Sequence, residues 1–248
     1  MNKMRIIHMS DIHGDFTSLD TALDYVKDSG ADVLAITGDL AGSELSEEEA
    51  TEYTKALGSL HQVSGTINQI SKGHADTFKA ASELILNQKL AELKDFEPHA
   101  ETYLKFLELV EERLRKTYGE FKQRFDGLPH DMRVLLVPGN WDGRCIEDVL
   151  SEESIDGKTL KYQGVKFAGY GGSNDLPVNA LPPDLAVQFN EDEMYKFLTD
   201  SEADVVLSHV GPKMNLNGNL RNQHSSYALS VAMLQSQPNL VLHGHEHR

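Results

Sequence analysis

The chain has 248 residues, of which 40% are hydrophobic and 25% charged, so it can form a soluble domain with a sizeable core. Its 23 basic and 39 acidic residues give a formal net charge of −16, which repels nucleic-acid backbones and argues against long nucleic acid as a partner. The single cysteine excludes an intramolecular disulfide, and no signal-peptide pattern or membrane-spanning apolar run is present, so we expect a cytoplasmic protein without a membrane partner.

The first 40 residues alternate between short apolar strands and polar loops. Residues 4–9 predict a buried strand, and residues 17–29 predict a helix because their apolar positions recur at helical spacing. Residues 32–37 predict a second strand. A strand–helix–strand unit of this kind places its two strands in parallel.

Residues 44–130 differ from the rest of the chain because they are rich in Glu and Lys and nearly free of Gly and Pro. Their apolar residues recur at steps of three and four, which predicts amphipathic helices. One helix is expected over residues 77–93, and Pro98 is suited to begin the next. We therefore expect a single domain over residues 1–248 that carries a helical insertion. The insertion either packs only on itself or provides a contact surface, and for the latter a homodimer contact is favoured over a lid.

Short apolar runs that predict strands recur after the insertion. A hairpin is expected over residues 161–170, where Gly164 separates two short strands, and a helix is expected from Ser225 to Gln237. The remaining strands are predicted at residues 133–138, 204–208 and 239–243.

Side chains that bind metal ions follow five of the predicted strands. These clusters are Asp11-Ile12-His13-Gly14, Gly38-Asp39, Gly139-Asn140-Trp141-Asp142, His209, and Gly244-His245-Glu246-His247. Ligands of open α/β sheets bind at the carboxyl ends of the strands, so these clusters can meet in one site. Carboxylate, amide and imidazole groups suit Mn²⁺, Fe and Zn²⁺. Seven such ligands are enough for two ions that share a carboxylate, a pair that can clamp the oxygens of a phosphoryl displacement.

The order D-x-H, G-D, G-N-x-D, H, G-H-x-H resembles the calcineurin-like metallophosphoesterase superfamily over the whole chain except the insertion. Residues 208–213 and 222–247 are similar to its small prokaryotic members. The resemblance implies an α/β fold in which a β-sandwich of two mixed sheets is flanked by helices, and hydrolysis by a metal-bridging hydroxide. It also implies that Asp39 bridges the two ions, that the first ion binds Asp11, His13 and His247, and that the second binds Asn140, His209 and His245. Mn²⁺ is expected, with Fe, Zn²⁺ or Ni²⁺ as alternatives.

The chain departs from this family at two places. The family usually has G-N-H-[DE], whereas this chain has Trp141, whose indole can donate a hydrogen bond but cannot transfer a proton. His224 is a candidate replacement acid or else a surface or capping histidine, and Asp142 is either catalytic or only structural. The family also usually continues beyond its last histidine with a strand or hairpin, so we expect C-terminal strands to be missing after residue 248.

These patterns predict a dinuclear-metal phosphoric ester hydrolase that acts on a small phosphorylated substrate. A phosphodiester is favoured over a phosphomonoester, because Trp141 cannot help a poor leaving group to depart. The alternative is a catalytically weak scaffold or regulatory subunit that keeps the fold. Trp141 and the long insertion favour that alternative, and the complete set of seven ligands opposes it.

Overall fold

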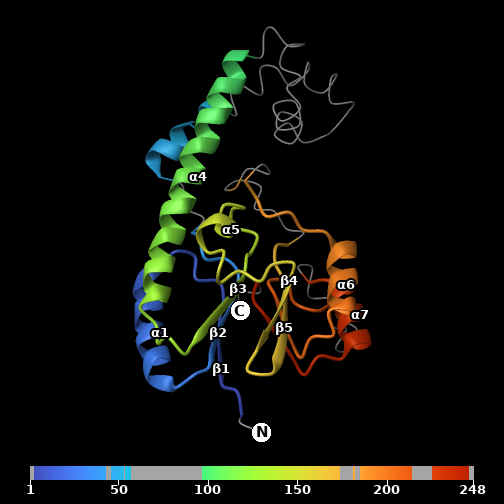
Figure 1. Cartoon of the computed structure of the whole chain (residues 1–248). Coiled ribbons are helices and arrows are strands. Elements are labelled where there is room, and N and C mark those ends of the chain that lie inside the picture. The colour runs from blue at the N-terminus through green and yellow to red at the C-terminus, as the bar shows by residue number, and fades with distance from the viewer. Residues whose placement is uncertain are drawn as a thin grey trace.

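Two β-sheets pack face to face and carry helices on their outer surfaces (Figure 1). The computed structural model describes residues 3–42, 46–52, 54–56, 97–173, 181, 185–213 and 225–245, without the side chains of residues 97–100 and 103. The helix expected over residues 77–93 lies outside the described residues, as do His224 and His247.

The first sheet is parallel and has the order β1 (Ile6–Met9), β2 (Val33–Thr37), β3 (Arg133–Val137). Met9 is paired with Ile36, and Ile36 with Leu136, so the three strands end at nearly the same level. The residues that follow each strand are therefore brought to one edge of the sheet.

The second sheet is mixed and has the order β4 (Lys158–Tyr162), β5 (Val165–Tyr170), β6 (Val205–Ser208), β7 (Leu240–His243). β4 and β5 form the expected antiparallel hairpin, and β5, β6 and β7 are parallel. Tyr170, Ser208 and His243 are paired across the sheet, so these strands also end at a common edge. The predicted α/β sandwich of two sheets flanked by helices is confirmed.

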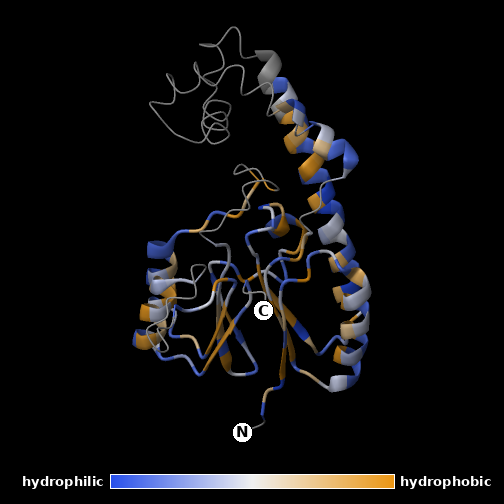
Figure 2. Ribbon diagram, turned by 180° about the vertical axis from the view of Figure 1, so that it is seen from behind, coloured by the Kyte–Doolittle hydropathy of each residue, from blue (hydrophilic) through white to orange (hydrophobic). Residues whose placement is uncertain are grey.

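Alternate residues of the central strand β2 enter different parts of the core, as the period of two of a β-strand requires. Val33 and Ala35 pack with Phe167 and other residues of the second sheet, between the two sheets. Leu34 and Ile36 pack on the opposite face, against the helices. Figure 2 shows strongly hydrophobic residues along the strands of both sheets.

Helices cover the outer face of each sheet (Figure 1). α1 (Phe16–Ser29) and α4 (Glu97–Asp126) lie on the first sheet, and α6 (Glu191–Asp200) and α7 (Tyr227–Ser236) lie on the second. α1 ends at Ser29, as expected for the helix over residues 17–29, and Gly30 caps it with a left-handed φ of 64°. α6 and the short α5 (Ile146–Val149) were not predicted from the sequence. None of the helices within the described ranges is both long and apolar enough to cross a membrane.

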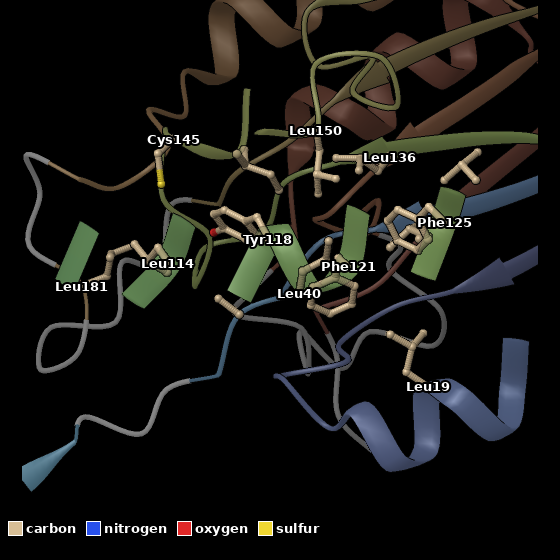
Figure 3. Packing of buried hydrophobic residues seen from close by; sticks show 14 of the residues in the cluster. Leu19, Leu40, Leu114, Tyr118, Phe121, Phe125, Leu136, Cys145, Leu150 and Leu181 are labelled. Carbon is tan, nitrogen blue, oxygen red and sulfur yellow. The ribbon is translucent and has the colours of Figure 1, made fainter. Parts of the chain in front are cut away.

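α4 belongs to the insertion and runs along the body of the domain (Figure 1). Figure 3 shows the packing of its residues Leu114, Tyr118, Phe121 and Phe125 in the core. The buried residues of α4 share one face and join the same core as Leu34 and Ile36 of β2. They are Phe106, Val110, Leu114, Tyr118, Phe121 and Phe125. This part of the insertion therefore does not pack only on itself, because it supplies much of the core outside the first sheet. A homodimer contact through the insertion stays a prediction.

Candidate metal centre

The loops after the strands bring metal-binding side chains together at one edge of the sandwich. One group consists of Asp39, His209 and His245, and a second consists of Asp11, His13 and Asp39. In each group the ligand atoms lie within 4.8 Å of one another. Because Asp39 belongs to both groups, it occupies the position expected of a carboxylate shared by two ions.

Left-handed backbone conformations aim several of these side chains at the site. The φ angles of Asp11, His13, Asp39 and His245 are 55°, 49°, 54° and 71°. Such conformations are uncommon outside glycine and cost on the order of 1–3 kcal/mol each. Hydrogen bonds between the loops hold them, since the Asp11 amide donates to the Gly38 carbonyl at 3.0 Å and the His13 amide to the Asp39 carbonyl at 2.8 Å.

His209 is fixed in the orientation that a metal ligand needs. It is fully buried, and its Nδ1 donates to the carbonyl oxygen of Thr37 at 2.8 Å. A histidine held through one ring nitrogen presents the other to the metal. Here Nε2 points into the site.

The atoms around His209 Nε2 are arranged as ligands of a cation rather than as a set of mutual hydrogen bonds. This nitrogen lies 2.9 Å from Asn140 Oδ1, 3.0 Å from His245 Nδ1 and 3.4 Å from Asp39 Oδ2. One proton can satisfy only one of these contacts, and the other atoms then direct lone pairs at the same place. A divalent cation would turn all of them into ligands, so these residues fit the second ion predicted from the sequence.

Asp39 and His209 influence each other's ionisation. Burial acts to raise the pKa of Asp39, but the hydrogen bond and charge of His209, with the Trp141 amide, outweigh it and lower the pKa. Burial acts to lower the pKa of His209, but the hydrogen bond and charge of Asp39 outweigh it and raise the pKa. Each group therefore stabilises the charged form of the other. A cation that binds His209 through Nε2 competes with a proton for that nitrogen.

The group around Asp11 and His13 is the more open of the two. Both carboxylate oxygens of Asp11 accept from the His245 amide at 3.1 Å, which links the ends of β1 and β7. His13 Nε2 lies 3.8 Å from Asp39 Oδ2, and the His13 side chain is 26% exposed. The expected third ligand of this ion, His247, lies outside the described residues, so its role stays a prediction.

Asp142 lies behind the site rather than in it. It is fully buried, and its carboxylate accepts hydrogen bonds from the amides of Leu40 and Ala41 at 3.1 Å each and from the amide of Gly139 at 2.8 Å. Burial, followed by the charge of Asp39, raises the pKa of Asp142 against the effect of these amides. This environment favours the structural interpretation of Asp142, and a catalytic role stays a prediction.

Trp141 serves the site through its backbone. Its amide donates to Asp39 Oδ1 at 2.9 Å and so helps to orient the shared carboxylate. The half-buried indole meets the His13 ring edge-on, with 6.3 Å between the ring centroids and 81° between the planes. The indole thus reaches the open side of the site without adding a proton donor or acceptor that could replace an imidazole.

Ser173 is a site residue that was not predicted from the sequence. Its Oγ lies 3.4 Å from His245 Nε2. It follows β5 in the sequence Gly171-Gly172-Ser173, at the same edge as the other clusters. A polar residue after glycines at the end of a strand was the signal that could have identified it.

Gly139→Ala is expected to abolish metal binding. A Cβ at residue 139 would lie 2.0 Å from Asp39 Oδ1 and 2.4 Å from the Asp39 amide nitrogen, so the shared carboxylate must move. Metal content after gel filtration, measured by plasma mass spectrometry, checks this. Gly119→Ala is the matched control, because a Cβ there meets nothing within 4 Å. Full metal occupancy in the Gly139→Ala protein would contradict this expectation.

The fold and the shared-carboxylate geometry together define a two-sheet α/β protein of the metallophosphoesterase class. The sequence model of the calcineurin-like phosphoesterase family matches residues 4–248, and the chain therefore belongs to that family. The two ligand groups agree with membership of this family.

One solved structure supports the fold, and none of the similar proteins names a substrate. The uncharacterized protein MJ1162 of Methanocaldococcus jannaschii is 34% identical over 87 residues, which are 33% of this chain and 38% of that protein. One crystal structure resembles 97% of this chain and 83% of its own chain, with a TM-score of 0.59 and 12% identity. The crystal structure of TT1561 of Thermus thermophilus has a TM-score of 0.47 and 16% identity, covering 99% of this chain and 83% of that one.

Proposed function

We propose that the protein hydrolyses a small phosphodiester with the help of two divalent cations, with Mn²⁺ as the favoured metal. The observation that carries this proposal is the position of Asp39 in both ligand groups. A shared carboxylate holds two ions close together, and two ions about 3.5–4 Å apart suit the in-line displacement of a phosphate ester.

Each side chain has a defined task in this proposal. Asp39 would bridge the ions, His209 would bind one of them through Nε2, and Asp11, held by the His245 amide, would bind the other. When bound, the ions supply a water-derived nucleophile at neutral pH and neutralise charge on the phosphoryl oxygens. The loop hydrogen bonds hold the ligands in place before substrate arrives, so little reorganisation is needed.

The preference for a diester follows from Trp141. A general acid contributes about 10²–10⁴-fold when the leaving group is difficult to expel, and an indole cannot supply that proton. The enzyme is therefore expected to favour activated esters, whose leaving groups are stable as anions, and a diester is the favoured substrate among them. Asp142 is poorly placed to supply the proton, because it is fully buried behind the site.

The test compares bis-p-nitrophenyl phosphate with p-nitrophenyl phosphate, using purified protein with and without Mn²⁺. Hydrolysis is expected to require the metal and to be faster with the diester. A faster reaction with the monoester would overturn the diester preference alone. The absence of any rate with Mn²⁺, Fe²⁺, Zn²⁺ or Ni²⁺ would favour the scaffold alternative.

His224 remains the proposed replacement acid, and the position of the described residues that follow it supports that proposal. The Ser226 amide donates to the Gly211 carbonyl at 2.9 Å, which holds the start of α7 two residues from His209. His224→Ala is expected to lower turnover by about 10-fold or more. This threshold lies below the range of about 10²–10⁴-fold for a general acid, because other proton donors can substitute in part. Metal content is expected to stay unchanged.

The control for His224→Ala is His130→Ala, which removes an exposed histidine after the C-terminal end of α4. Turnover of both variants is measured at saturating Mn²⁺ over a range of pH. Parental turnover in the His224→Ala protein would remove His224 from the mechanism.

A further inference from the structure

The insertion helix α4 reaches the loop that carries Asn140 through a buried hydroxyl group. Tyr118 is fully buried, and its Oη accepts from the Gly143 amide at 2.7 Å. The same hydroxyl donates to Asp142 Oδ1 at 3.2 Å. Figure 3 shows Tyr118 on the face of α4 that points into the domain. Burial, followed by the charge of Asp142, raises the pKa of Tyr118 well above its ordinary value, so the hydroxyl keeps the proton that it donates.

Asp142 passes this contact on to both ligand loops. It accepts hydrogen bonds from the amides of Leu40 and Ala41, the two residues that directly follow Asp39. It also accepts a hydrogen bond from the amide of Gly139, the residue that precedes Asn140. The Asp142 carboxylate therefore connects the Asp39 loop to the Asn140 loop. Tyr118 holds this carboxylate by a hydrogen bond from α4.

Further contacts of Arg113 and Leu114 show that α4 is fitted closely to these loops. Arg113 Nη1 donates to the Gly42 carbonyl at 3.2 Å, and Arg113 Nε donates to Glu49 Oε1 at 2.6 Å. Leu114 packs so near Gly143 that a Cβ on this glycine would lie 2.6 Å from Leu114 Cδ1. Both loops thus rest on a single helix.

We propose that Tyr118 is a positioning residue for the metal centre, acting through Asp142 on Asp39 and Asn140. A phenylalanine would fill nearly the same volume, so the part of Tyr118 that matters is the hydroxyl. Without it the Gly143 amide loses its acceptor and Asp142 loses a donor inside the protein, where unmet hydrogen bonds are most unfavourable. The inference rests on the proposed function, because it presumes that this site binds metal.

Tyr118→Phe tests the role of the hydroxyl. Loss of a hydrogen-bond partner behind metal ligands typically weakens metal affinity or activity about 10–100-fold. We expect the Mn²⁺ dissociation constant, measured by titration calorimetry, to rise by about 10-fold or more on that basis. We also expect kcat at limiting Mn²⁺ to fall, excess Mn²⁺ to restore most of it, and KM for bis-p-nitrophenyl phosphate to stay near its parental value.

Phe121→Leu is the matched control for lost stability. Phe121 is fully buried on the same helix and its ring contacts Phe16 and Phe125, but it has no hydroxyl group to hold Asp142. Both variants are compared at equal distance below their own Tm. Tyr118→Phe protein that binds Mn²⁺ as tightly as the parent, or no more weakly than the Phe121→Leu protein, overturns the inference.

A double-mutant cycle with Asp142→Asn checks the route of the effect. If Tyr118 acts through Asp142, the two changes in Mn²⁺ affinity are less than additive. Fully additive effects would contradict that route. Parent protein that binds no divalent metal would overturn the proposed function and this inference with it, whereas a metal-binding parent with an equally good Tyr118→Phe variant would overturn the inference alone.

Discussion

Asp39→Asn protein is expected to lose both metal ions and, with them, hydrolytic activity. Asp39 is 1% exposed and contributes to both ligand groups, so the neutral amide removes the one negative charge that the two sites share. Partners behind a metal ligand are worth about 10–100-fold in affinity, so loss of a direct, shared ligand is expected to exceed about 100-fold. Metal content by mass spectrometry and the rate with bis-p-nitrophenyl phosphate check this result.

The number of metal ions bound per chain distinguishes a ligand shared by two ions from a ligand of one ion. His13 belongs to only one of the two groups, so His13→Ala protein is expected to keep one ion. Asp156→Asn is the control for loss of a carboxylate, because Asp156 accepts from the Gly171 amide at 2.7 Å and belongs to neither group. If Asp39→Asn protein held two ions at parental affinity, the bridging role of Asp39 would be wrong.

Local sequence patterns predicted the strands and the place where they end. Each strand other than β4, which reads KTLKY, is a short apolar run followed by glycine or a polar side chain. Such a run needs no knowledge of the rest of the fold to be recognised. The rule that parallel strands present ligands at their carboxyl ends then brought residues from Asp11 to His245 to one edge. The structure places six of the seven predicted ligands within the described residues at that edge, and whether they bind metal stays a prediction.

Features that depend on contacts between distant segments could not be predicted in this way. The periodicity of α4 indicated that one face is buried, but it could not show that this face packs on β2. The hydrogen bond from Tyr118 to Asp142 joins residues 24 positions apart, and that from Leu40 to Asp142 joins residues 102 positions apart. His209 is oriented by the carbonyl oxygen of Thr37, which lies 172 positions earlier in the chain. Because this acceptor is a backbone atom, the pattern of side chains could not predict it.

Trp141→His protein is expected to hydrolyse esters with poor leaving groups faster than the parent does. A histidine at residue 141 would stand beside His13, where the indole now meets that ring edge-on, and would bring a proton donor to the open side of the site. The gain is expected to approach about 10²-fold for an alkyl leaving group, the lower end of the range for general acid catalysis. It is expected to be small for p-nitrophenol, which leaves readily without a proton.

The measurement is the dependence of kcat/KM on the pKa of the leaving group, over a series of aryl and alkyl phosphodiesters. A proton donor makes that dependence shallower, because the leaving oxygen carries less charge in the transition state. Trp141→Phe is the control, since it keeps the backbone amide that donates to Asp39 but adds no acid. Equal slopes for the His and Phe variants would mean that residue 141 is not where the proton enters, and the donor would then have to reach the substrate from another loop, with His224 as the first residue to test.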